Sequence, residues 1–78
     1  MATRENILKI ISDLDINVDI SSLKVSIPLT EQGLDSLDMA TIFFELEDRF
    51  NIKVTDDDVE SGKLESIDKI LYFINGSS

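Results

Sequence analysis

Apolar residues recur at helical spacing in three separate segments of this chain, and this pattern restricts the fold more than any other feature. In residues 3–15 they follow an i, i+3, i+4, i+7 stripe, in residues 36–50 they cover a wide arc, and a third stripe runs through residues 66–75. Such spacing is typical of amphipathic helices. A short fourth helix is predicted at residues 55–60, where a threonine precedes three aspartates. The sequence therefore predicts an all-α fold, a small four-helix bundle with three main helices and one short helix.

A long connection is expected between the first and second helices. Residues 17–34 contain scattered β-branched residues and the only proline, Pro28, without the clean alternation of a strand. A loop of this length is expected to be held by its own apolar residues. The candidate tethers are Leu23, Val25, Ile27 and Leu29. Without repeats or a low-complexity linker, residues 1–78 are predicted to form a single domain.

Composition excludes several functional classes. The chain has no cysteine and no histidine, so disulfides and a histidine-based catalytic triad are impossible. The sequence also offers no nucleophile–base pair, so we do not expect an enzyme. A net charge of −9 repels nucleic acid and anionic lipid and favours basic protein surfaces. The amino-terminal residues resemble neither a signal peptide nor a membrane span. We expect a cytoplasmic monomer that has no stable association with membranes.

The most specific motif is the run Gly33-Leu34-Asp35-Ser36-Leu37-Asp38 at the start of the second predicted helix. The glycine turn that opens this run places the primary hydroxyl of Ser36 at an exposed helix start. Unpaired N–H groups and the helix dipole there favour a phosphate. The simplest interpretation is a helix cap, a role for which Asp35 and Ser36 compete. If one of them is the cap, the other stays free.

The Asp35-Ser36-Leu37 motif, its mid-chain position and the order of the predicted helices together resemble the acyl carrier protein family. The resemblance extends from Leu29 through Gly76, including the segments 50–54, 56–58 and 72–76, and more loosely over the first helix. It implies that Ser36 carries 4′-phosphopantetheine through a phosphodiester, and that the terminal thiol of this arm holds acyl groups as thioesters. It also implies that Asp35 engages the metal ion of a phosphopantetheinyl transferase and that Leu37 packs beside the arm. The alternative for Asp35 is a cap or a solvated charge, and for Leu37 it is core packing.

The resemblance further implies a docking surface on the second helix. Its partners would be the transferase and acyltransferases and ketosynthases with basic docking surfaces. The candidate docking residues are Asp38, Thr41, Glu45, Glu47 and Asp48. A solvated acidic face is the simpler interpretation of these charges. Many fatty-acid carriers have acids where this chain has Thr41 and Arg49, which suggests a dedicated carrier for polyketide or modified-lipid synthesis.

Two other functions remain as alternatives. In a non-covalent acidic helical adaptor, Ser36 would be only a cap, and a peptidyl or D-alanyl carrier would use the serine for other cargo. Calcium binding is rejected, because the EF-hand-like spacing that begins at Asp13 has Val18 where glycine is required and Lys24 where glutamate is required. No metal site is expected. The helical apolar residues are assigned to the core, which in the family can enclose an acyl chain. They are Phe43, Phe44, Leu46, Val59, Ile67 and Leu71, and Met39 and the phenylalanines are the candidates for side chains that shift to make room.

Overall fold

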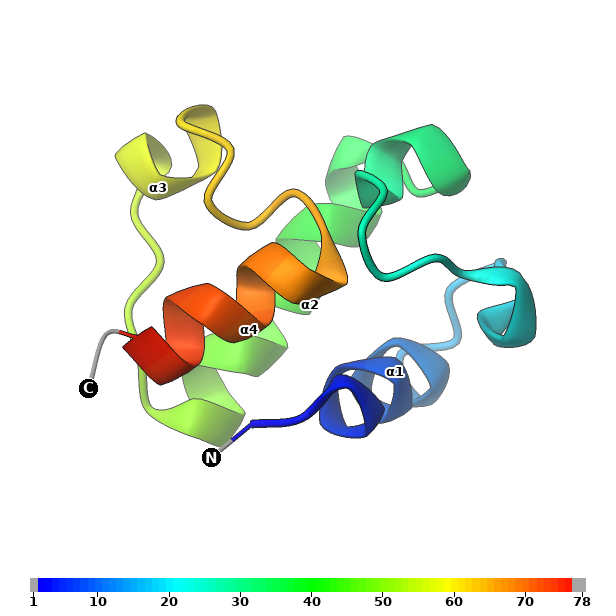
Figure 1. The fold of residues 1–78 in the computed structure, drawn as a ribbon, viewed down its shortest axis with the longest axis horizontal. Coiled ribbons are helices and arrows are strands. Elements are labelled where there is room, and N and C mark those ends of the chain that lie inside the picture. Colours follow the sequence, from blue (N-terminus) through cyan, green and yellow to red (C-terminus); the bar gives the residue numbers. More distant parts are fainter. Residues whose placement is uncertain (1, 77–78) are drawn as a thin grey trace.

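The computed structural model describes residues 2–76, and all of its regular elements are helical (Figure 1). The prediction of an all-α bundle is therefore confirmed. The three main helices are α1 (Arg4–Asp13), α2 (Ser36–Phe50) and α4 (Ile67–Gly76), and the short helix is α3 (Asp56–Glu60). The connection between α1 and α2 contains two 3₁₀ turns, η1 (Ile20–Ser22) and η2 (Leu29–Gln32). None of the helices in this part of the chain is long and apolar enough to cross a membrane.

Capping boxes set the starts of α1 and α3. Thr3 caps α1: its hydroxyl accepts from the N–H of Asn6 at 3.2 Å, and the Asn6 side chain accepts from the N–H of Thr3 at 2.9 Å. Thr55 and Asp58 repeat this arrangement at α3. Each box satisfies two backbone donors that a helix start leaves without partners. These helices therefore begin where a polar side chain can close the box.

The long connection is attached to the segment between α3 and α4 and to the first turn of α4. The backbone N–H of Leu29 donates to the carbonyl of Glu65 at 2.8 Å, and the N–H of Asp68 donates to the carbonyl of Val25 at 3.0 Å. Leu29 is fully buried, and Leu23 and Val25 pack, partly buried, against the core. These three predicted tethers are confirmed, and the fourth, Ile27, is half-buried. The loop thus depends on distant residues for its shape.

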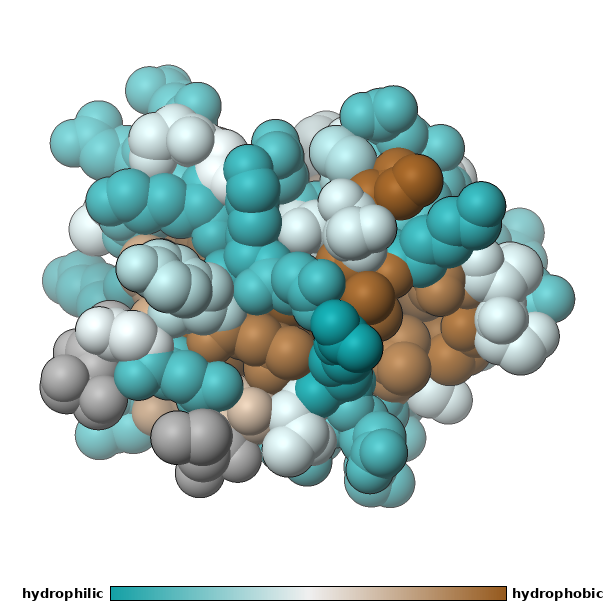
Figure 2. Space-filling view, viewed as in Figure 1, coloured by the Kyte–Doolittle hydropathy of each residue, from teal (hydrophilic) through white to brown (hydrophobic). Residues whose placement is uncertain are grey.

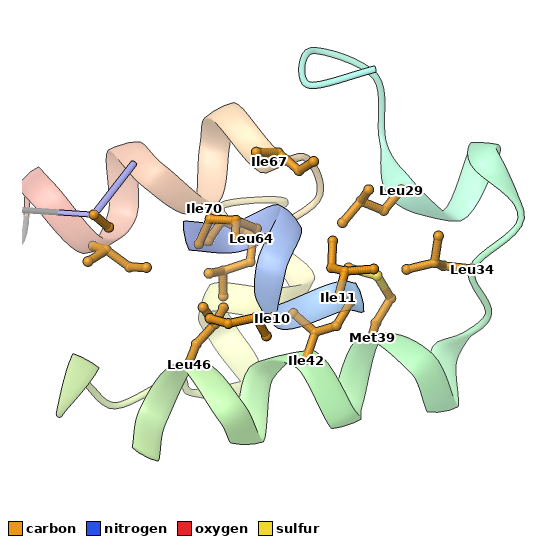
Figure 3. Packing of buried hydrophobic residues seen from close by; sticks show 13 residues of the cluster. Ile10, Ile11, Leu29, Leu34, Met39, Ile42, Leu46, Leu64, Ile67 and Ile70 are labelled. Atoms are coloured by element: carbon orange, nitrogen blue, oxygen red, sulfur yellow. The ribbon is translucent and has the colours of Figure 1, made fainter. Parts of the chain in front are cut away.

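One hydrophobic core joins the helices. Met39, Ile42 and Leu46 project from one face of α2 toward α1 and α4 (Figure 3). The wide apolar arc of residues 36–50 predicts that this helix is central, but the principal helix–helix contacts are those of α1 with α4 and with α2. The physical reason is that part of the wide apolar arc of α2 faces outward.

Several residues assigned to the core lie elsewhere. Phe44 and Val59 are exposed, whereas Phe43 and Leu71 are only partly buried against the core. Position 44 lies on the side of α2 opposite the inward stripe of positions 39, 42 and 46, because each residue advances an α-helix by about 100°. In the view of Figure 2, hydrophobic residues form a band across the middle of the surface, bordered by hydrophilic residues. Gly76 follows the third apolar stripe, residues 66–75, and a glycine in that place predicts a stop beyond the helix end, but Gly76 is the final residue of α4.

Candidate functional site

The structure decides the competition between Asp35 and Ser36 at the start of α2. Asp35 is the cap: its Oδ1 accepts from the N–H of Asp38 at 2.8 Å, and Asp38 Oδ2 accepts from the N–H of Asp35 at 3.2 Å. Ser36 is the first residue of the helix and is exposed. Within residues 2–76 its hydroxyl makes no hydrogen bond. The hydroxyl is therefore available to another molecule without any loss to the helix.

The turn before Ser36 depends on a glycine and a buried leucine. Gly33 has a φ of +104°, a conformation that residues with a side chain rarely adopt. A Cβ at this position would meet no atom within 4 Å, so the backbone angle and not crowding calls for glycine. Leu34 is buried, and its N–H donates to the carbonyl of Leu29 at 3.3 Å. Because Leu34 holds the turn against the core, Ser36 projects from a fixed base.

A pocket of about 480 Å³ lies beside Ser36, between η2, α2, α3 and the segment that leads to α4. Apolar side chains from three of these segments line it, with polar groups around them. The lining residues are Thr30, Ser36, Met39, Ala40, Phe43, Asp56, Val59, Glu60, Leu64 and Glu65. Its volume is within the range of sites that hold small ligands. An apolar group attached near the Ser36 hydroxyl would have a place to lie.

This site fits a phosphodiester-linked group. The N–H groups of Ser36 and Leu37 have no partner in the described part of the chain, because the first residues of a helix lack internal acceptors. They lie at the positive end of the α2 dipole, which favours a phosphate. Leu37 has 74% of its surface exposed, so the core-packing interpretation of this residue is wrong. The exposed hydroxyl, the free donors and the pocket together have the chemistry that a phosphodiester-linked arm requires.

The predicted docking acids differ in how free they are. Asp48 is exposed, but Asp38, Glu45 and Glu47 are half-buried. Asp38 closes the α2 capping box, and Glu47 Oε2 accepts from the N–H of Val54 at 2.8 Å. Of the four carboxylates predicted to lie on the exposed side of α2, Asp48 is exposed and the other three are partly shielded by their neighbours. Asp38 and Glu47 accept from backbone N–H groups near the two ends of α2, and Glu45 accepts from the Arg49 side chain.

Arg49 neutralises part of the same helix. Its Nε lies 3.1 Å from Glu45 Oε2 within α2, and its Nη1 lies 3.7 Å from Asp13 Oδ2 at the end of α1. Thr41, another predicted docking residue, is exposed, and its Oγ1 donates to the carbonyl of Leu37 at 3.0 Å. In the carboxyl-terminal half of α2, the Glu45 carboxylate is thus paired with the Arg49 guanidinium.

An exposed aromatic residue was missed by the sequence analysis. Phe44 has 75% of its surface exposed and lies two helical turns from Leu37 on the same face of α2, with Thr41 between them. The signal was present in the spacing, because position 44 is out of phase with the buried stripe of α2. The surface next to Ser36 therefore combines apolar and acidic groups.

At the start of α3, the carboxylate of Asp58 has partners close by in the chain. The pKa of the Asp58 carboxyl is held below its ordinary value, first by the hydrogen bond from the Thr55 backbone N–H and also by the Thr55 hydroxyl and the nearby Lys63 ammonium. In the described residues, no group of three or more carboxylates is arranged so that it could hold a metal ion. Asp58, the last residue of the acidic run at the start of α3, thus closes the cap of that helix.

Comparison with known proteins agrees with this geometry. The phosphopantetheine attachment site family matches residues 6–69. The acyl carrier protein of Campylobacter jejuni subsp. doylei is 28% identical over 76 residues, which cover 96% of this chain and 95% of that protein. The acyl carrier protein of a second Campylobacter jejuni strain is 29% identical with the same coverage. The chain therefore belongs to the acyl carrier protein family, whose cofactor is covalently attached 4′-phosphopantetheine.

Proposed function

We propose that this chain is an acyl carrier protein whose attachment residue is Ser36. One observation carries the proposal: Ser36 is exposed at the first position of α2, and its hydroxyl makes no hydrogen bond within residues 2–76, while Asp35 is the N-cap of the helix. When bound, the arm supplies a terminal thiol that holds acyl groups. The residues of this chain present the hydroxyl, bind the phosphate through backbone N–H groups at the start of a helix, and form an apolar pocket beside it.

Attachment requires a partner enzyme to supply the base. A bond forms between Ser36 Oγ and a phosphorus of coenzyme A, the pyrophosphate bond breaks, and adenosine bisphosphate leaves. The proton of the hydroxyl must pass to the partner, because this chain has no histidine and Asp35 is occupied by the helix cap. A phosphopantetheinyl transferase is thus the first partner, and enzymes that load and elongate acyl groups follow. The carrier itself catalyses none of these steps, and we place it in the cytoplasm.

The test is the intact mass of the purified chain after incubation with a phosphopantetheinyl transferase and coenzyme A. Wild type should gain the mass of one arm. Ser36→Ala should gain none, and Ser26→Ala, which removes another exposed and unbonded hydroxyl, should behave as wild type. No mass gain by the folded wild type would favour the non-covalent adaptor instead.

We further propose that the carrier serves a dedicated pathway and not general fatty-acid synthesis. Thr41 supplies no charge, and Arg49 is paired with Glu45 and Asp13, so basic synthases meet a weakened acidic helix. The double variant Thr41→Glu/Arg49→Glu should therefore raise the rate of acyl transfer by a fatty-acid ketosynthase. High salt should remove the gain, because salt screens long-range attraction between exposed charges. A wild type that already matches a housekeeping carrier would contradict this proposal.

A further inference from the structure

The side chain of Gln32, the last residue of η2, closes the long connection on itself. Its Oε1 accepts from the backbone N–H of Lys24 at 2.6 Å. Its Nε2 donates to the carbonyl of Lys24 at 2.8 Å and to the carbonyl of Ile27 at 2.9 Å. Both amide hydrogens are thus used. The amide group supplies to the loop backbone the hydrogen-bond partners that an adjacent strand would supply in a β-sheet. We call this arrangement the Gln32 clamp.

The clamp holds one wall of the pocket beside Ser36. On one side of η2, Gln32 is joined to residues 24–27, and on the other side Leu29 donates to the carbonyl of Glu65. Thr30, between these two attachments, lines the pocket together with Ser36 and Glu65. The position of η2 therefore determines how far apart Ser36 and this wall of the pocket lie.

The clamp also holds the upstream end of the turn that presents Ser36. Only Gly33, Leu34 and Asp35 separate Gln32 from the attachment residue. The downstream end of the turn is held by the α2 capping box, whereas Gly33 allows rotation next to the clamp. Without the clamp, residues 24–34 would lose the three hydrogen bonds of the Gln32 side chain and keep the backbone bonds, among them those of Leu29 to Glu65, Leu34 to Leu29 and Asp68 to Val25.

We propose that Gln32 is a positioning residue, which holds the turn so that the Ser36 hydroxyl meets the active site of the transferase in a reactive orientation. This inference rests on the proposed attachment at Ser36. Small errors in the placement of a reacting group lower the rate of the chemical step more than they lower binding. A loosened turn should consequently lower kcat for arm attachment, while the docking surface on α2, and with it KM, stays nearly unchanged.

Two variants and one control test the clamp. Gln32→Glu keeps the shape but replaces two donors with a carboxylate that faces the Lys24 and Ile27 carbonyls, and Gln32→Met removes all of the hydrogen bonds. Ser26→Glu adds the same charge to an exposed position of the same loop, outside the clamp. The measurements are kcat and KM of a purified phosphopantetheinyl transferase with coenzyme A, and hydrogen exchange of the Lys24 amide.

Both clamp variants should lower kcat at least about fivefold, and Ser26→Glu should not. Exchange at Lys24 should accelerate in both, which confirms that the clamp has opened. A variant that is merely less stable would lose folded protein, and this loss raises the apparent KM and leaves kcat unchanged. Unchanged kcat with faster exchange at Lys24 would overturn the positioning role and leave the attachment site intact. A folded wild type that accepts no arm would overturn both proposals.

Discussion

Glu47 offers the sharpest test of which acids on α2 belong to the fold. Its carboxylate accepts from the N–H of Val54 at 2.8 Å, where the chain returns along α2 after the helix end. Asn51, the C-cap of α2, has a φ of +52° and turns the chain back. Glu47 therefore ties the segment before α3 to α2. We predict that Glu47→Ala lowers the free energy of unfolding because this tie is lost.

The magnitude follows from the type of bond. A hydrogen bond to a charged group contributes about 1.5–3 kcal/mol, and the half-buried Val54 amide would be left without a partner, so we expect a loss of about 2 kcal/mol. In a domain of this size, that loss corresponds to a decrease in Tm of about 8–16 °C. Glu47→Gln keeps a neutral acceptor of similar shape and should lose about half as much, roughly 1 kcal/mol.

Urea unfolding followed by circular dichroism measures both values. The control is Asp48→Ala, because Asp48 is the exposed neighbour, carries the same charge and takes part in no ion pair in the described residues. Its removal should change stability by no more than about 0.5 kcal/mol. If Glu47→Ala and Asp48→Ala unfold at the same urea concentration, the structural role of Glu47 is refuted and both acids belong to the solvated face.

Two further predictions concern the ends of helices. Ser36→Ala should abolish arm attachment but change stability by at most about 0.5 kcal/mol, since the cap of α2 is the preceding aspartate; urea unfolding checks this, and a large loss would show that Ser36 has a structural role. Asp58 has a pKa in the folded state below its ordinary 3.8, so its contribution to stability is complete above that value and is lost as the pH falls through the folded pKa. Titration of the Thr55 amide resonance should give a midpoint below 3.8, whereas a midpoint at or above it would contradict the capping geometry.

Much of the fold and part of the site could be predicted from local pattern. The apolar spacing located the helices, and α2 begins and ends at the predicted residues. Thr55 was identified as the cap of the short helix, because caps involve residues three positions apart. The same spacing placed Ser36 at a helix start. It did not settle whether Asp35 or Ser36 is the cap, since both side chains suit that position.

The sequence by itself determined the helices, the Thr55 cap of the short helix and the serine at the start of α2, because these depend on neighbours within one or two helical turns. Only the tertiary structure decided which polar groups remain free. The Glu47 carboxylate accepts from the Val54 N–H after a chain reversal, and Arg49 pairs with Asp13 on another helix. The Gln32 side chain hydrogen-bonds to the backbone of a loop whose sequence has no periodic pattern. A carboxylate in a sequence has the same charge whether it faces water or a backbone donor. Its availability to a partner is set by the groups that folding brings against it.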